Sequence, residues 1–298
     1  SAVPIVLGGL KRLEYRGYDS SGLVIVSGKK PQFKNFRSVG IVSNLERFLK
    51  PKNIKSNIAL GHTRWATHGL VNTENTHPHI VGNVAVVHNG IIENHAELRN
   101  TLKDGGAKFL SKTDTEVIPH MLNNLVGNAV PPIEAIKCVM REVKGSYALG
   151  IIFLNDPHTL YGVCNGQPLV LGHSKAGVTL ASSEHAMDSA VDYVTRLEDG
   201  DIATIYPSVR IFNVHSNDFV ARDSSTPDKE LIKLTKGEFR YFMEKEISEQ
   251  PEVIMKTLDS LLNKSKKEIL SEDFYPCFSS DYHIHIVACG TSYHAGLI

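Results

Sequence analysis

The chain has 298 residues, of which 42% are hydrophobic and 21% are charged, as is ordinary for a globular protein of one or two domains. Lys and Arg together number 32, as do Asp and Glu, so the formal net charge is zero. Such a balance provides no long-range field to hold nucleic acid or an anionic membrane. We therefore expect a small substrate, and neither a nucleic-acid nor a membrane partner.

The chain has four cysteines, none of them in a Cys-x-x-Cys pair: Cys138, Cys164, Cys277 and Cys289. Their spacing matches neither a zinc site nor a disulfide framework, so reduced thiols in a cytoplasmic protein are predicted. The apolar run that follows Ser1 has no basic segment before it and is too short to span a membrane. Because the chain lacks an initiator Met, we expect it to be a fragment of a longer protein.

The first segment predicts a helix, because Val6, Leu10 and Leu13 recur at helical spacing. Pro4 suits the first turn of such a helix, and "YRGYDSSG" then ends it. Apolar and β-branched residues next predict a series of short strands. These runs are residues 23–26, 58–61, 84–87, 147–154, 168–172, 178–182, 202–205 and 209–214.

Helices interrupt these strands in blocks. One is predicted from Glu93 to Leu102 and another over residues 132–143. Between them, Thr113 and Glu116 have the spacing of a capping box ahead of an apolar helical run. Because strands and helices do not alternate strictly, we predict a layered α+β fold in which helices cover the sheet faces.

The composition changes after Arg222, where "RDSSTPDKELIKLTKG" is polar and rich in turn formers. We therefore predict a first domain over residues 1–228, a linker over 229–240 and the beginning of a second domain over 241–298. The second segment has a helical pattern, with Pro251 expected at a helix start or kink. Its last residues, "YHIHIVACGTSYHAGLI", predict a strand, a glycine turn and the first residues of a helix.

Residues 61–69 read "GHTRWATHG" and place Arg64 and the only tryptophan, Trp65, among polar side chains. A guanidinium can bind a carboxylate through two parallel hydrogen bonds, so Arg64 is a candidate substrate clamp. The alternatives are a surface salt bridge for Arg64 and a place in the core for Trp65. His68 and His77 lie close by in sequence, although a single histidine is often only structural.

A second motif, "VAVVHNGIIEN", carries a buried strand that is predicted to end at His88, Asn89 and Gly90. The Asn89 side chain and the unobstructed Gly90 backbone N–H are the two donors that an oxyanion hole needs. An Asn-Gly hairpin turn explains the same residues. The local sequence does not decide between these interpretations.

In "TDTEV", Asp114 begins a helix and is either a plain N-cap or a carboxylate that binds a substrate ammonium. An Arg for a carboxylate and an Asp for an ammonium would together recognise an α-amino acid. The donors at Asn89 and Gly90 would then serve an acyl transfer at the side chain of that amino acid.

Seven motifs follow one another as "LEYRGYDSSG", "GHTRWATHG", "HPH", "VVHNGIIEN", "KTDTEV", "MEKEISEQP" and "ACGTSYHAG". In this order they resemble the glutamine–fructose-6-phosphate aminotransferases (isomerising), the glucosamine-6-phosphate synthases of amino-sugar biosynthesis, over essentially the whole chain. The resemblance implies an N-terminal-nucleophile (class II glutamine amidotransferase) domain, followed by the truncated start of an α/β sugar-isomerase (SIS) domain. "EKEIxEQP" and "CGTS" separate this family from the purine and asparagine amidotransferases.

Members of this family hydrolyse glutamine and transfer the ammonia to fructose 6-phosphate, giving glucosamine 6-phosphate and glutamate. The resemblance therefore implies L-glutamine and fructose 6-phosphate as substrates, and it implies no metal or organic cofactor. It also implies a homo-oligomer, because the isomerase domains of the family pair.

The resemblance also implies roles for individual residues. Arg64 would bind the glutamine α-carboxylate, Asp114 would bind the α-ammonium, and Trp65 would gate the ammonia passage. The other matched positions are Thr67, His68 and His77 in the glutamine pocket, Asn89 and Gly90 in the oxyanion hole, and Thr291 and Ser292 at the sugar phosphate.

The nucleophile of the family is an N-terminal cysteine whose own α-amino group acts as general base. A free α-amine, with a pKa of roughly 7.7–8.0, can accept the thiol proton at neutral pH. In the family this cysteine opens a strand, and Ser1 matches the helix that follows that strand. A strand and turn of about ten residues are therefore expected before Ser1. The chain as written is therefore expected to lack glutaminase activity.

The alternative to an enzyme is a non-catalytic glutamine-binding regulatory module, and the coding sequence upstream of Ser1 would distinguish the two.

Overall fold

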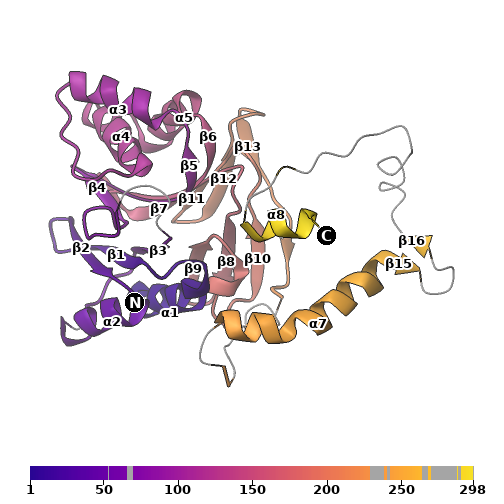
Figure 1. The fold of residues 1–298 in the computed structure, drawn as a ribbon. Coiled ribbons are helices and arrows are strands. Elements are labelled where there is room, and N and C mark those ends of the chain that lie inside the picture. The colour runs from indigo at the N-terminus through magenta and orange to yellow at the C-terminus, as the bar shows by residue number, and fades with distance from the viewer. Residues whose placement is uncertain are drawn as a thin grey trace. The chain divides into compact units, whose positions relative to one another are not determined.

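The computed structural model describes residues 1–52, 54–65, 70–228, 238–239, 242–263, 268–269, 287 and 290–297. The chain divides into two compact units, Ser1–Thr235 and Lys236–Ile298. In the first unit the layers stack as helix, sheet, sheet and helix (Figure 1). This arrangement of helices and antiparallel sheets confirms the predicted α+β class for the first unit.

A small sheet and two helices form one side of the first unit. The sheet has the order β2-β1-β3, and both of its strand pairs are antiparallel. The elements are α1 (Ala2–Leu13), β1 (Ser20–Ser27), β2 (Gln32–Val39), α2 (Val42–Leu49) and β3 (Ala59–Arg64). Leu10, Leu23 and Leu45 are buried in one cluster between them, and α1 confirms the helix predicted at the start of the chain.

The central layer is a seven-stranded antiparallel sheet in the order β13-β12-β11-β7-β6-β5-β4. Its strands are β4 (His79–Val81), β5 (Val84–Ile92), β6 (Gly145–Phe153), β7 (Asp156–Asn165), β11 (Asp201–Ile205), β12 (Val209–Asn213) and β13 (Asp218–Val220). Side chains of β6 alternate between the two faces. Leu149 and Ile151 belong to the cluster beneath the helices, whereas Ala148 and Ile152 belong to the clusters between the sheets.

A four-stranded sheet, ordered β14-β10-β8-β9, shares a layer with the three-stranded sheet. Its strands are β8 (Val170–Ser174), β9 (Gly177–Ala181), β10 (Tyr193–Arg196) and β14 (Ser224–Ser225). Leu171 of β8 packs with Ala148 of the central sheet, and Leu60 of β3 packs with Ile152 on the same face. Among the described strands, β3 and β9 are each the last strand of their sheet.

Helices cover the opposite face of the central sheet (Figure 1). They are α3 (His95–Asp104), α4 (Val117–Gly127) and α5 (Pro132–Glu142), and α3 and α5 confirm the helices predicted over 93–102 and 132–143. Ile118, Leu122 and Ile136 are fully buried against the sheet. Short 3-10 helices occur at η1 (Glu14–Arg16), η2 (Lys50–Lys52), η3 (Asp114–Glu116) and η4 (Glu184–Ala186).

The capping box predicted at Thr113 and Glu116 is wrong. The Thr113 side chain makes no capping hydrogen bond at the start of η3. The Glu116 carboxylate instead accepts hydrogen bonds from the backbone N–H groups of Leu110 and Ser111, at 2.8 and 2.6 Å. Glu116 therefore stabilises the preceding loop rather than the helix N-terminus.

The described part of the second unit contains two helices and a short strand pair. They are α7 (Phe242–Leu261), β15 (Leu262–Asn263), β16 (Glu268–Ile269) and α8 (Gly290–Gly296). Pro251 lies inside α7 rather than at its start. The strand predicted before α8 and most of the predicted linker lie outside the described residues, so the boundaries at 228 and 240 stay predictions. No described helix is long and apolar enough to cross a membrane.

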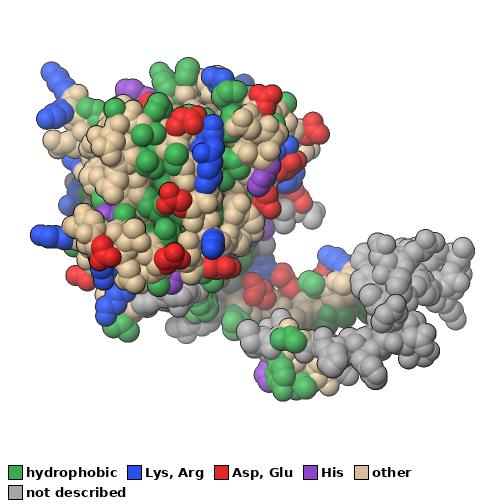
Figure 2. Space-filling view, turned by 90° about the horizontal axis from the view of Figure 1, so that it is seen from above, with side chains coloured by type: hydrophobic (Ala, Val, Ile, Leu, Met, Phe, Trp, Pro, Cys, Tyr) green, Lys and Arg blue, Asp and Glu red, His purple; other side chains and the backbone are tan. Residues whose placement is uncertain are grey.

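Basic and acidic side chains are interspersed over the face shown in Figure 2. Neither sign dominates that face. This distribution agrees with the equal numbers of basic and acidic residues in the sequence.

Candidate functional site

A cavity of about 620 Å³ lies in the first unit, with strands β3 and β9 among its walls. Helix α1, the central strands β5 and β6 and the short helix η3 also contribute to the lining. The sequence-predicted residues that line it are Arg64, Trp65, His77, Asn89, Gly90 and Asp114. The fold therefore brings to one place side chains that come from separate parts of the sequence.

The structure does not describe the side chains of the other predicted site residues. Thr67 and His68 lie outside the described residues. Thr291 and Ser292 belong to α8 in the second unit, and their side chains are not among those described. Their proposed roles stay predictions.

Arg64 ends strand β3, and only 5% of its surface is exposed. Its Nη1 donates a hydrogen bond to the Leu70 carbonyl oxygen at 3.5 Å. Burial lowers the pKa of Arg64, whereas the nearby carboxylates of Asp19 and Asp114 act to raise it. A guanidinium stays charged at neutral pH under such conditions. The surface salt bridge considered for Arg64 is therefore wrong, because this cation lies in the cavity wall close to Asp114.

Trp65 directly follows β3 and lines the same cavity. Its side chain is 55% exposed, so the alternative place in the hydrophobic core is wrong. The indole packs edge-on against Tyr18, with ring centroids 5.4 Å apart. A partly exposed aromatic ring at this position is compatible with a gate, and that role stays a prediction.

Asn89 and Gly90 lie inside strand β5, which continues past them rather than ending there. Both residues pair with strand β6, so the alternative Asn-Gly hairpin turn is wrong. Gly90 has a φ of 112°, and a Cβ at this position would collide with the carbonyl oxygen of Ser146. Only glycine fits here without strain. Both residues line the cavity.

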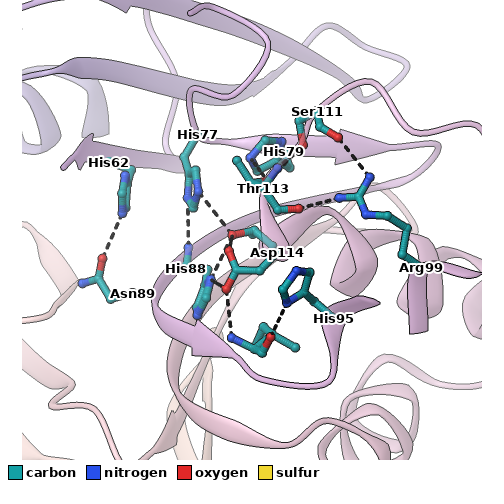
Figure 3. A network of polar contacts seen from close by, with 12 residues as sticks. His62, His77, His79, His88, Asn89, His95, Arg99, Ser111, Thr113 and Asp114 are labelled. Carbon is teal, nitrogen blue, oxygen red and sulfur yellow. Dashed lines mark hydrogen bonds and ion pairs between the residues drawn. The ribbon is translucent and has the colours of Figure 1, made fainter. Parts of the chain in front are cut away.

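Asp114 opens η3 and is 7% exposed. Its Oδ2 accepts a hydrogen bond from the Ile92 backbone N–H at 2.8 Å, which fixes the carboxylate against the end of β5 (Figure 3). The plain N-cap considered for Asp114 is wrong, because Thr113 occupies the N-cap position of η3. The carboxylate is therefore held by a backbone donor of another element while it lines the cavity.

A group of histidines packs beside these residues (Figure 3). Its members are His62, His77, His79 and His88. The His77 ring lies 4.2 Å from that of His62 and 4.7 Å from that of His79, between ring centroids. Burial lowers the pKa of His62 and of His88 to about 4, and it lowers the pKa of His77 and His79 well below the usual value. All four rings are therefore neutral at neutral pH.

Threonine hydroxyls connect this group to η3. Thr115 Oγ1 lies 2.9 Å from His88 Nδ1 and 3.3 Å from His77 Nε2. His62, His88 and Thr115 are not among the site residues predicted from the sequence. Strand alternation could have indicated His62, because residues 62 and 64 face the same side of β3. No local signal marks Thr115.

The two described cysteines are poorly placed to act as nucleophiles. Burial raises the pKa of Cys164 to about 12, which leaves almost no thiolate at neutral pH. Cys138 lies on α5 and is not among the residues that line the cavity. Cys277 and Cys289 lie outside the described residues. Within the described part of the chain, no cluster of His, Cys, Asp and Glu has the arrangement of a metal site.

Comparison with known proteins gives a consistent result. A family model, the glutamine amidotransferase domain, matches residues 62–189. The glutamine–fructose-6-phosphate aminotransferase (isomerising) of Pseudomonas aeruginosa is 42% identical over 301 residues, 99% of this chain and 49% of its own length. That of Mesorhizobium japonicum is 42% identical over 300 residues, 99% of this chain and 48% of its own length. The chain thus spans about half the length of the curated relatives it matches.

Solved structures show the same fold. A glutamine phosphoribosylpyrophosphate amidotransferase from B. subtilis matches with a TM-score of 0.64 at 24% identity, over 73% of this chain and 48% of its own. An allosteric regulatory enzyme of purine biosynthesis gives the same TM-score of 0.64 at 23% identity, over 75% of this chain and 51% of its own. These two likenesses confirm the N-terminal-nucleophile fold of the glutamine amidotransferases. The relatives that are 42% identical over 99% of the chain establish that it belongs to the family of glutamine–fructose-6-phosphate aminotransferases.

Proposed function

We propose that the protein to which this chain belongs hydrolyses glutamine and transfers the ammonia to fructose 6-phosphate, giving glucosamine 6-phosphate and glutamate. The observation that carries the glutaminase half is that Arg64, Asp114 and the Asn89–Gly90 pair line one cavity. The acceptor sugar rests on the name of the relatives, of which the chain spans about half. We also propose that the protein is a cytoplasmic homo-oligomer.

Arg64 and Asp114 supply opposite charges to the two ends of an α-amino acid. The Arg64 guanidinium is proposed to bind the α-carboxylate through paired hydrogen bonds, and the Asp114 carboxylate to accept from the α-ammonium. Arg64 is buried and close to Asp114, so both charges act in a poorly solvated place where such contacts are strong. Thr67, His68 and His77 are proposed as further wall residues.

The reaction needs a nucleophile, and we propose an N-terminal cysteine on a strand that precedes Ser1. Among the described strands β3 and β9 are the last of their sheets, and both line the cavity, so a further strand between them could pair with both. The thiol would attack the glutamine amide carbon, and the α-amino group would take its proton and give it to the departing ammonia. Water would then hydrolyse the thioester to glutamate. Residues 1–298 alone should therefore bind glutamine without hydrolysing it.

During attack, negative charge develops on the amide oxygen. Asn89 Nδ2 and the Gly90 backbone N–H are proposed to donate hydrogen bonds to it, a contribution on the order of a hundredfold in rate for each donor. Trp65 is proposed to gate the passage of ammonia to the isomerase domain. Thr291 and Ser292 are proposed to bind the sugar phosphate in that domain.

The test uses the full-length protein with Arg64 replaced. Arg64→Ala should reduce glutamine-dependent synthesis on the order of a hundredfold, because it removes a buried charge-assisted contact. Synthesis from fructose 6-phosphate and added ammonia should be retained, since that reaction bypasses the glutamine pocket. Both rates are measured on one preparation, with Arg141→Ala as control because Arg141 is exposed on α5.

Two outcomes would contradict the proposal in different ways. Equal losses with glutamine and with ammonia would remove the case for Arg64 as the carboxylate clamp. A full-length protein that binds glutamine and releases no glutamate would instead favour the non-catalytic regulatory module.

A further inference from the structure

A histidine from the opposing sheet layer holds the carboxamide of Asn89. His62 lies on β3 and Asn89 on β5, and His62 Nε2 is 2.9 Å from Asn89 Oδ1 (Figure 3). Both residues line the cavity. Among the described residues Asn89 Nδ2 has no acceptor, so this donor remains for a ligand.

The proton on His62 decides which way the Asn89 amide faces. The ring is neutral at neutral pH, because burial lowers the pKa of His62 to about 4, and it therefore carries one N–H. If Nε2 carries the proton, it donates to Asn89 Oδ1, and Nδ2 is directed away from the ring. If Nδ1 carries it, Nε2 accepts from Nδ2, and Oδ1 takes the outward position. An outward oxygen would repel an oxyanion.

The neighbouring histidine fixes the ring of His62. His77 stacks on it with centroids 4.2 Å apart and an interplanar angle of 23°. His77 Nδ1 accepts from the backbone N–H of His88 at 3.3 Å, so its Nε2 carries the proton and lies 3.3 Å from Thr115 Oγ1. His77 is thus held at both nitrogen atoms and can set the plane of His62.

The two nitrogen atoms of His62 have unequal surroundings. Nδ1 is buried and makes no well-formed hydrogen bond with a described residue. The His88 backbone lies near the ring and acts to raise the pKa of His62, against the effect of burial. Nε2 faces the Asn89 oxygen at normal hydrogen-bond distance. The better partner therefore lies at Nε2.

We propose that His62 is a positioning residue, whose Nε2–H holds Asn89 Oδ1 so that Asn89 Nδ2 stays directed at the substrate carbonyl oxygen. This inference rests on the proposed function, in which Asn89 supplies one donor of the oxyanion hole. His62 acts through Asn89, and it neither takes nor gives a proton in the reaction.

The tautomer can be measured without any activity. Histidine labelled with ¹⁵N in the ring gives distinct signals for protonated and unprotonated nitrogen, and His62→Gln identifies the signals of His62. We expect a neutral ring with its proton on Nε2 near neutral pH. A proton on Nδ1, or a charged ring, would overturn the inference whether or not the protein is a glutaminase.

Kinetics of the full-length protein test whether the contact between His62 and Asn89 affects glutamine hydrolysis. His62→Leu should lower kcat for glutamine hydrolysis by about tenfold to a hundredfold and change KM little, because the oxyanion donor acts in the transition state. His62→Gln, which keeps an N–H donor, should recover most of the loss. In an Asn89→Ala background, His62→Leu should have little further effect.

The outcomes separate this inference from the function on which it rests. A wild-type protein without glutaminase activity would refute the proposed function, while the tautomer still tests the His62–Asn89 contact. With an active wild type, an equal loss for His62→Leu in both backgrounds, or a loss confined to KM, would refute the positioning role. Circular dichroism of each variant confirms that it is folded.

Discussion

Gly90 lies where two constraints on the chain coincide. Its φ of 112° belongs to a region that strains L-residues, and the Ser146 carbonyl oxygen occupies the place of a Cβ. A side chain here would therefore both strain β5 and displace the backbone of β6. The neighbouring Asn89 would move with the strand.

We expect Gly90→Ala to reduce the free energy of unfolding by about 1–3 kcal/mol and to lower kcat for glutamine hydrolysis more than tenfold. Urea unfolding and steady-state assays measure the two effects. Gly127→Ala is the control, because a Cβ at this end of α4 meets nothing within 4 Å. Equal stability of the two variants would show that the constraint at Gly90 is unimportant.

At this scale the sequence predicts binding groups better than it predicts their supports. Arg64 and Asp114 are candidates by charge and context, their binding roles stay predictions, and the structure places both in one cavity. The contact between His62 and Asn89 does not follow, because it joins two sheet layers across 27 residues of sequence. Periodicity indicates the face on which a side chain lies, but not the residue of another layer that it meets.

Among the elements, the loop before η3 depends on one buried carboxylate. Glu116 is 3% exposed, and its two oxygens accept from the backbone N–H groups of Leu110 and Ser111. The Ser111 hydroxyl donates to the same carboxylate at 2.6 Å. This loop leads directly into Asp114, so Glu116 sets the position of a proposed substrate contact from outside the cavity.

Glu116→Ala should reduce the free energy of unfolding by about 2–5 kcal/mol, because it leaves backbone donors of the loop without an acceptor. Glutamine binding should weaken as well, since Asp114 loses its support. Glu116→Gln keeps one acceptor oxygen and should show a smaller loss. Urea unfolding and calorimetric titration with glutamine measure these effects, with Glu97→Ala on the exposed side of α3 as control. A Glu116→Ala protein as stable as this control would contradict the assignment.

Elements with a regular apolar pattern were predictable, and those without one were not. Strand β2 escapes prediction because most of its side chains are exposed or half-buried, and Phe36 alone is buried. Helix α2 spans eight residues, too few for its buried Val42, Leu45 and Leu49 to stand out as a helical repeat. The error at Glu116 has another cause, because a capping-box spacing does not reveal that a nearby loop competes for the carboxylate.

For the molecule as a whole, the fold gathers four neutral histidines beside strands β3, β4 and β5 and the short helix η3. Burial lowers the pKa of each of the four, and on His79 the positive charges of Arg37 and Arg64 act in the same direction. On His88, the carboxylate of Asp114 acts to raise the pKa against burial. The unfolded chain has no such environment, so its histidines would titrate near pH 6.5.

This difference makes the stability of the first unit depend on pH. Between about pH 6.5 and pH 4 the unfolded chain binds protons that the folded histidines do not, so stability is complete above about pH 6.5 and is lost as the pH falls. Each histidine contributes up to about 1.4 kcal/mol per pH unit. We expect urea unfolding, followed by the fluorescence of Trp65, to show this loss between about pH 6.5 and pH 5. His79→Gln should reduce the slope, because it removes one of the titrating groups, whereas His215→Gln, at an exposed position, should leave it unchanged. A free energy of unfolding that stays constant over this range would mean that the histidines are not buried in their neutral form.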